Sequence, residues 1–154
     1  MKTSEVDFRF PVIGFTTDED IWGWPDLDTL TKCGSMTLKD RMQDGMELID
    51  ADGRRWRVLS VTRTGRAGPL LSLARLLGAP PQSRIEHELE ALEPVSLKEV
   101  QARARASIKA HPEFWSEGEE GRDAELRNRL ADVDGVTTIG SLLETLGLDT
   151  FESY

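Results

Sequence analysis

The clearest alternation of apolar and polar residues covers residues 84–93. Ile85, His87, Leu89 and Ala91 fall on one face of an extended chain, while three glutamates fall on the other. This period of two predicts a half-buried β-strand.

A second alternating pattern predicts a β-hairpin. Residues 46–50 and 55–61 form its two arms, with Trp56 and Val58 at alternate positions of the second arm. Asp-Gly between the arms supplies the positive φ that a tight turn requires. Residues 8–15, rich in aromatic and β-branched side chains, predict another strand, in which Pro11 indicates an edge position or a bulge. Residues 16–28 fit no period and predict a loop.

A helical period follows Pro94. Leu97, Val100, Ala104 and Ile108 make one apolar stripe, and Ser96 with Glu99 forms a capping box at its start. Shorter helices are expected over residues 35–45, 122–132 and 138–146. Residues 27–33 and 69–77 suit either a helix or a strand. The pattern as a whole predicts one α+β domain over residues 1–154, an antiparallel sheet with helices packed on one face, the helices of residues 122–147 lying on it or appended to it.

Composition narrows the possible functions. The net charge of −9 disfavours nucleic-acid binding, which requires a concentrated cationic face. The apolar runs are too short to span a membrane. Acids occupy the first ten residues where a signal peptide would be apolar, so we expect a cytoplasmic protein. A single cysteine, Cys33, excludes an internal disulfide and a cysteine-based zinc site.

No pattern of catalytic residues is visible, and we expect neither an enzyme nor a bound cofactor or metal. His87 lies on the apolar face of its strand, which favours a core or edge imidazole over a ligand or base. His111 stands where a helix ends, which favours simple capping. Cys33 lacks a neighbouring histidine, which favours a small buried side chain.

The candidate binding site is the segment of residues 17–31. It carries five acids and no lysine or arginine, together with two tryptophans. Carboxylates around aromatic anchors suit recognition of a basic protein, because tryptophan is enriched among hot spots and charges steer the encounter. The predicted partner-binding residues are Asp18, Glu19, Asp20, Trp22, Trp24, Asp26 and Asp28. Alternatively, the two tryptophans fold back over the core as a lid.

Two further charged segments have less distinctive patterns. Residues 54–66 hold five arginines and no acid. They could form a surface for an anionic ligand, but pairing with the chain's own carboxylates, including those of Glu86, Glu88 and Glu90, is favoured. Residues 113–125 hold six acids and one arginine, which indicates a solvated loop or, as the alternative, a second acidic contact.

Residues 45–58, 97–100 and 108–115 together resemble small bacterial immunity proteins, which neutralise secreted polymorphic or contact-dependent toxins. The resemblance implies a cytosolic, non-catalytic, acidic protein that binds one basic toxin domain and blocks its active site. It assigns no functional residue position by position. The alternatives are an accessory or regulatory subunit of a housekeeping complex and, less favoured, a small enzyme or anionic-ligand-binding protein that uses His87 and the arginines of residues 54–66.

Overall fold

The computed structural model describes residues 1–66 and 82–148. Within them, six strands form one antiparallel sheet in the order β2-β1-β4-β5-β6-β3. The strands are β1 (Val12–Phe15), β2 (Ile21–Trp24), β3 (Lys32–Gly34), β4 (Glu47–Ile49), β5 (Arg55–Arg66) and β6 (Gln82–Leu92). The helices are the 3-10 turn η1 (Thr3–Glu5) and the α-helices α1 (Leu27–Leu30), α2 (Ser35–Lys39), α4 (Leu97–Ala110), α5 (Arg122–Gly135) and α6 (Ile139–Leu146). The α+β class is therefore confirmed.

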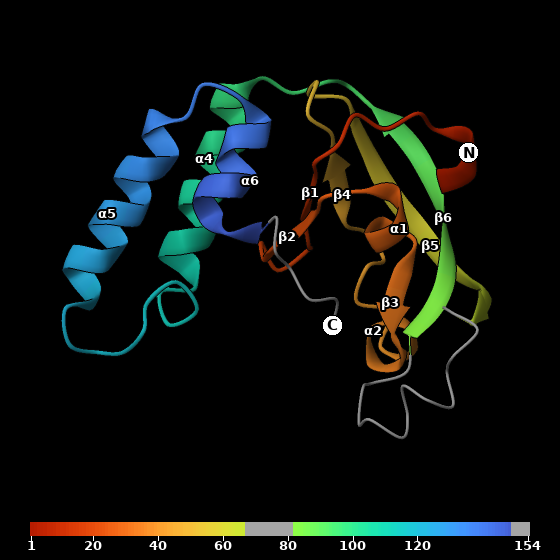
Figure 1. Ribbon diagram of the computed structural model, residues 1–154, viewed down its shortest axis with the longest axis horizontal. Helices are drawn as coiled ribbons and strands as arrows, with labels where there is room; N and C mark the ends of the chain where they lie inside the picture. Colours follow the sequence, from red (N-terminus) through yellow and green to blue (C-terminus); the bar gives the residue numbers. More distant parts are fainter. Residues whose placement is uncertain (67–81, 149–154) are drawn as a thin grey trace.

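The sheet is strongly curled. Two irregularities interrupt the long β5–β6 ladder, between Val58 and Ser60 and between Arg63 and Gly65. Such bulges bend a strand and increase its twist. Figure 1 shows the result: α4 and α6 lie beside β1 and β2 with α5 on their outer side, while α1, α2 and β3 lie within the curve of β5 and β6.

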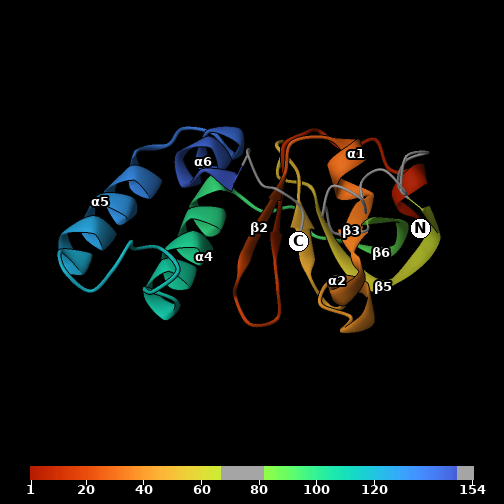
Figure 2. The same ribbon diagram turned by 60° about the horizontal axis from the view of Figure 1, so that its bottom comes forward.

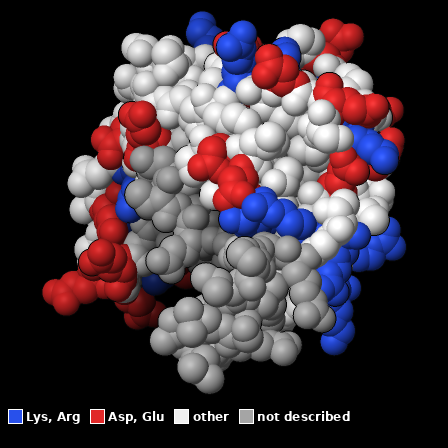
Figure 3. All heavy atoms as spheres, turned by 45° about the vertical axis from the view of Figure 1, so that its right-hand side comes forward, with Lys and Arg blue, Asp and Glu red and all other residues white. Residues whose placement is uncertain are grey.

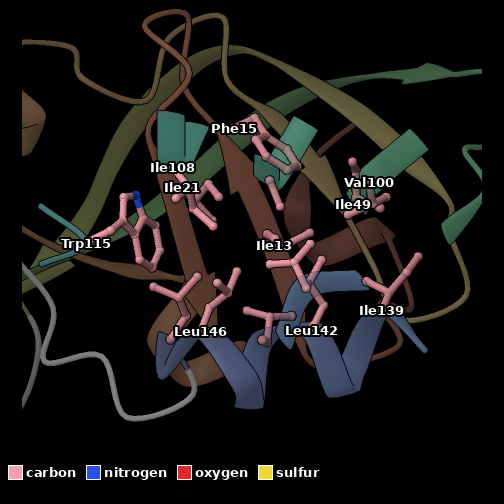
Figure 4. Close-up of a cluster of buried hydrophobic side chains, with 14 residues drawn as sticks. Ile13, Phe15, Ile21, Ile49, Val100, Ile108, Trp115, Ile139, Leu142 and Leu146 are labelled. Carbon is pink, nitrogen blue, oxygen red and sulfur yellow. The ribbon is translucent and has the colours of Figure 1, made fainter. Parts of the chain in front are cut away.

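Successive residues of β1 point into two different cores. Ile13 and Phe15 enter the helical core, the cluster between the sheet and α4–α6 (Figure 4). Val12 enters the sheet core on the opposite face, together with Leu48 and Trp56. The helical core comprises Ile13, Phe15, Ile21, Ile49, Val100, Ala104, Ile108, Trp115, Val133, Ile139, Leu142, Leu143, Leu146 and Leu148. The sheet core comprises Phe8, Val12, Trp24, Leu30, Met46, Leu48, Trp56, Val58 and Leu89.

Close packing of α6 on the sheet requires a glycine in β2. A Cβ atom added at Gly23 would lie 2.5 Å from Leu143 Cδ2 and 2.8 Å from Leu148 Cβ. The missing side chain therefore allows α6 and the residues after it to approach the edge strand.

The long periodic elements match the sequence predictions. The hairpin is formed by β4 and β5, the alternating strand is β6, and the three C-terminal helices are present. The capping box of α4 is also present, with Ser96 accepting from the amide of Glu99 and the Glu99 carboxylate accepting from the amide of Ser96.

Other segments differ from the sequence predictions or were left open by them. Residues 21–24 of the predicted loop form the edge strand β2, and β1 is consequently an interior strand with Pro11 just before it. Residues 27–33, left open between helix and strand, contain both α1 and part of β3. The helix predicted over residues 35–45 ends at Lys39. The ambiguous segment of residues 69–77 lies outside the described residues.

Candidate protein-binding surface

Three of the predicted site residues form the exposed tip of the turn between β1 and β2. Asp18, Glu19 and Asp20 are all exposed. Thr16 closes the turn: its amide donates to the carbonyl of Asp20 over 3.0 Å, and its Oγ1 accepts from the Asp20 amide over 3.0 Å. Glu19 adopts a positive φ of 64° at the tip. The turn therefore presents three carboxylates from a small, hydrogen-bonded frame.

The two tryptophans of the predicted site are not surface anchors as a pair. Trp24 is only 6% exposed and belongs to the sheet core. Trp22 is partly exposed and packs against the same core, with its ring centroid 6.2 Å from that of Trp24. Of the two alternatives left open by the sequence, the core position is the one that Trp24 takes.

The last two predicted site residues stabilise local structure. Asp26 is the N-cap of α1, and its carboxylate accepts from the Thr29 amide over 2.8 Å. Asp28 forms ion pairs with Lys32 and, over 2.6 Å, with Arg84. Hydrogen bonds from Lys32 and then Arg84 lower the pKa of Asp28. β2 separates both aspartates from the acidic turn.

His111 joins the acidic turn to the end of α4. Its Nε2 atom lies 3.1 Å from the backbone carbonyl oxygen of Asp18 and 3.3 Å from Asp20 Oδ1. Both oxygens are acceptors, so Nε2 carries the hydrogen and donates it. His111 is the C-cap of α4, as expected, but its contact with a turn 93 positions away has no signal in the sequence.

The loop after α4 adds an exposed aromatic side chain three residues after His111. Phe114 is 61% exposed, and its amide donates to the carbonyl of His111. Its ring meets that of buried Trp115 edge-on, with centroids 5.2 Å apart. Figure 2 shows the C-terminal end of α4, where this loop begins, on the same side of the molecule as the β1–β2 turn. We call the acidic surface the set Asp18, Glu19, Asp20, His111, Glu113 and Phe114, which Glu117, Glu119 and Glu120 extend along the loop.

Arg103 supports the turn from beneath. Its Nη1 atom lies 2.6 Å from Glu47 Oε2, and its Nε atom lies 4.0 Å from Glu19 Oε2. The guanidinium also stacks over the Phe15 ring at 4.2 Å. Glu47 is thus the nearer partner of this cation, and Glu19 at the tip pairs with it only over the longer distance.

Arginines of residues 54–66 largely pair with the chain's own acids, as favoured from the sequence. Arg54 lies 2.7 Å from buried Asp50, Arg55 lies 3.4 Å from Glu47, and Arg57 lies 3.7 Å from Glu90. Figure 3, which brings the β6 side forward, shows acidic and basic groups in mixed clusters.

The two remaining glutamates of β6 pair with the N-terminal residues instead. Glu86 lies 3.7 Å from Lys2 Nζ, and Glu88 lies 3.2 Å from the amine of Met1. The favoured pairing therefore holds for Glu90, whereas Glu86 and Glu88 have other partners.

His87 and Cys33 are buried. His87 Nε2 lies 2.7 Å from Gln43 Oε1, and Nδ1 lies 2.9 Å from Thr3 Oγ1. Burial lowers the pKa of His87 to about 4, against a smaller opposing effect of Glu86. Burial also raises the pKa of the Cys33 thiol. The neutral imidazole is thus a satisfied core group, and these hydrogen bonds tie it to residues other than the arginines of residues 54–66.

Two searches over residues 1–66 and 82–148 are negative. They contain no grouping of three or more histidine, cysteine or acidic side chains suited to a metal ion. None of their helices combines the length and the apolar character needed to cross a bilayer.

Comparison with protein-family models, curated proteins and solved structures finds no match for the chain.

Proposed function

We propose that this chain is a non-catalytic, cytoplasmic binding protein of the immunity type, which occludes a basic toxin domain through the acidic surface. The observation that carries the proposal is the 61% exposure of Phe114 three residues after His111, whose ring contacts Asp18 and Asp20 of the acidic turn. Aromatic side chains supply binding energy at the centre of an interface, while surrounding charges accelerate and orient the encounter.

The acidic surface replaces part of the site predicted from the sequence. Asp18, Glu19 and Asp20 keep their proposed role of attracting a basic partner. Phe114 takes the anchoring role that Trp24 cannot perform from inside the core. Trp22 is partly exposed but packs against the sheet core. It is not counted in the acidic surface and has no part in the proposal.

The net charge of −9 and the resemblance to immunity proteins favour a toxin as the partner. An accessory subunit would use the same surface on a different protein, so the identity of the partner separates these two functions. We therefore choose as the binding probe the purified product of the gene adjacent to this one.

The test measures association and dissociation rates of that probe on the immobilised chain. Phe114→Ala is expected to accelerate dissociation about 30-fold, since a hot-spot side chain contributes about 2 kcal/mol or more. Asp18→Asn, which removes one exposed charge, is expected to slow association and to reduce its salt dependence. The matched control is Met36→Ala on α2, where an apolar side chain is 71% exposed away from the acidic surface.

Equal dissociation rates for Phe114→Ala and Met36→Ala would place the contact elsewhere. If the unaltered chain does not bind the probe, the proposal that its partner is a toxin is rejected and the accessory-subunit alternative is favoured.

A further inference from the structure

The contact of His111 with the acidic turn depends on a group that can change its charge. Nε2–H donates to the Asp18 carbonyl and faces the Asp20 carboxylate whether or not the ring is protonated. Only the protonated ring adds a positive charge to this contact. That charge would also lie at the C-terminal end of the 14-residue helix α4, where a cation is favoured.

Three elements meet at His111. Their charged groups are Asp18, Glu19 and Asp20 in the turn, Arg103 and Lys109 on α4, and Glu113 in the following loop. Arg103 is bonded to Glu47 and lies two turns of helix away from His111. The charged side chain in contact with the imidazole is the Asp20 carboxylate.

We propose that His111 is a pH-sensitive latch that holds the β1–β2 turn against the end of α4 more firmly when its ring is protonated. The role that we give the latch rests on the proposed function. The latch holds the turn at the end of α4, where the loop with Phe114 begins, and so assembles the acidic surface before a partner arrives. Mild acidification strengthens the latch, and a rise in pH loosens it.

The composition of the chain makes the latch accessible to experiment. His111 and His87 are its only histidines. His87 stays neutral until pH falls far below the ordinary range for histidine, because burial lowers its pKa to about 4. A change seen between about pH 5.5 and pH 7.5, where a histidine ordinarily changes its charge, therefore does not come from His87.

The experiment is hydrogen exchange of the turn amides in the isolated full chain. The Glu19 amide donates to the Thr16 carbonyl, and the Asp20 amide donates to Thr16 Oγ1, so both report on turn opening. Exchange rates are divided by those of unstructured peptides at the same pH. Protection is expected to be about two- to fivefold greater near pH 5.5 than near pH 7.5, the effect of a partly exposed ion pair.

Three variants test whether His111 and Asp20 cause that difference. His111→Gln keeps an N–H donor but cannot gain a charge, and it is expected to abolish the pH difference. Asp20→Asn removes the facing carboxylate and should do nearly the same. Asp18→Asn is the matched control: it removes the same charge from the same turn, but its contact with the ring uses the backbone carbonyl, so the difference should persist.

An equal pH difference in His111→Gln and the unaltered chain, or none in the unaltered chain, would overturn the latch. Neither result requires a partner. If the pH difference is absent but partner binding still depends on Phe114, the latch is rejected and the proposed function stands. If the pH difference is present but partner binding does not depend on Phe114, only the proposed function is rejected.

Discussion

Replacing Trp24 by alanine distinguishes a core tryptophan from a binding residue. The indole is 6% exposed and lies against β1, where a Cβ atom added at Gly14 would be 2.7 Å from Trp24 Cζ3. Because Gly14 has no side chain to move into the vacated space, the cavity in Trp24→Ala cannot close easily.

The expected loss of stability is therefore about 3–5 kcal/mol, the usual range for truncating a buried aromatic side chain. For a chain of this length, each kcal/mol lowers the melting temperature by about 2–4 °C, which gives a decrease of roughly 6–20 °C. The matched comparison is Phe114→Ala, where the side chain is 61% exposed. It is expected to change the free energy of unfolding by less than about 0.5 kcal/mol.

Thermal and urea unfolding followed by far-ultraviolet circular dichroism are suitable assays, because loss of a tryptophan would alter a fluorescence signal directly. A melting temperature of Trp24→Ala within about 2 °C of the unaltered chain, below the shift expected for even 1 kcal/mol, would refute the core assignment. An equal decrease in Phe114→Ala would refute the contrast between the two sites.

Two further predictions concern stability. Ile108→Ala should lower the free energy of unfolding by about 2–4 kcal/mol, since this side chain is 0% exposed in the helical core. Glu88→Ala should lower it by less than about 1 kcal/mol, because the ion pair of Glu88 with Met1 is exposed. Urea denaturation measures both changes. Unfolded histidine binds a proton below about pH 6.5, whereas His87 in the folded chain does so only near pH 4, so stability falls as pH decreases through that window, by about 3 kcal/mol at most. Urea midpoints across the window should decrease less in His87→Gln than in the unaltered chain, and parallel curves would contradict this prediction.

Periodicity was sufficient to predict the elements that bury one face over many residues. β6 and α4 are such elements, and their apolar positions match those expected, except that Leu97 is only partly buried and Ala91, at the end of β6, is exposed. β2 escaped detection because it has four residues, three of them buried, and therefore no alternation. Gly23 and the neighbouring acids further suggested a loop.

The sequence allowed only part of the acidic surface to be predicted. The acids of residues 17–20 could be identified from composition, but the Asp20–His111 contact arises from tertiary packing of α4 beside β1 and β2. Phe114 and Trp115 are adjacent aromatic residues, yet one is 61% exposed and the other 5%. No local rule separates them, because the direction of the chain after Pro112 decides which ring enters the helical core.

Because β1 contributes side chains to both cores, it couples the unfolding of one core to that of the other. Separation of α4–α6 from the sheet would bring Ile13 and Phe15 into water while Val12 stayed packed on the reverse side. We therefore expect the helical core and the sheet core to unfold together. Calorimetry should show a single heat-absorption peak, with equal calorimetric and van't Hoff enthalpies. A fragment ending at Leu92 would lack one wall of the helical core and should behave as an expanded, loosely packed chain.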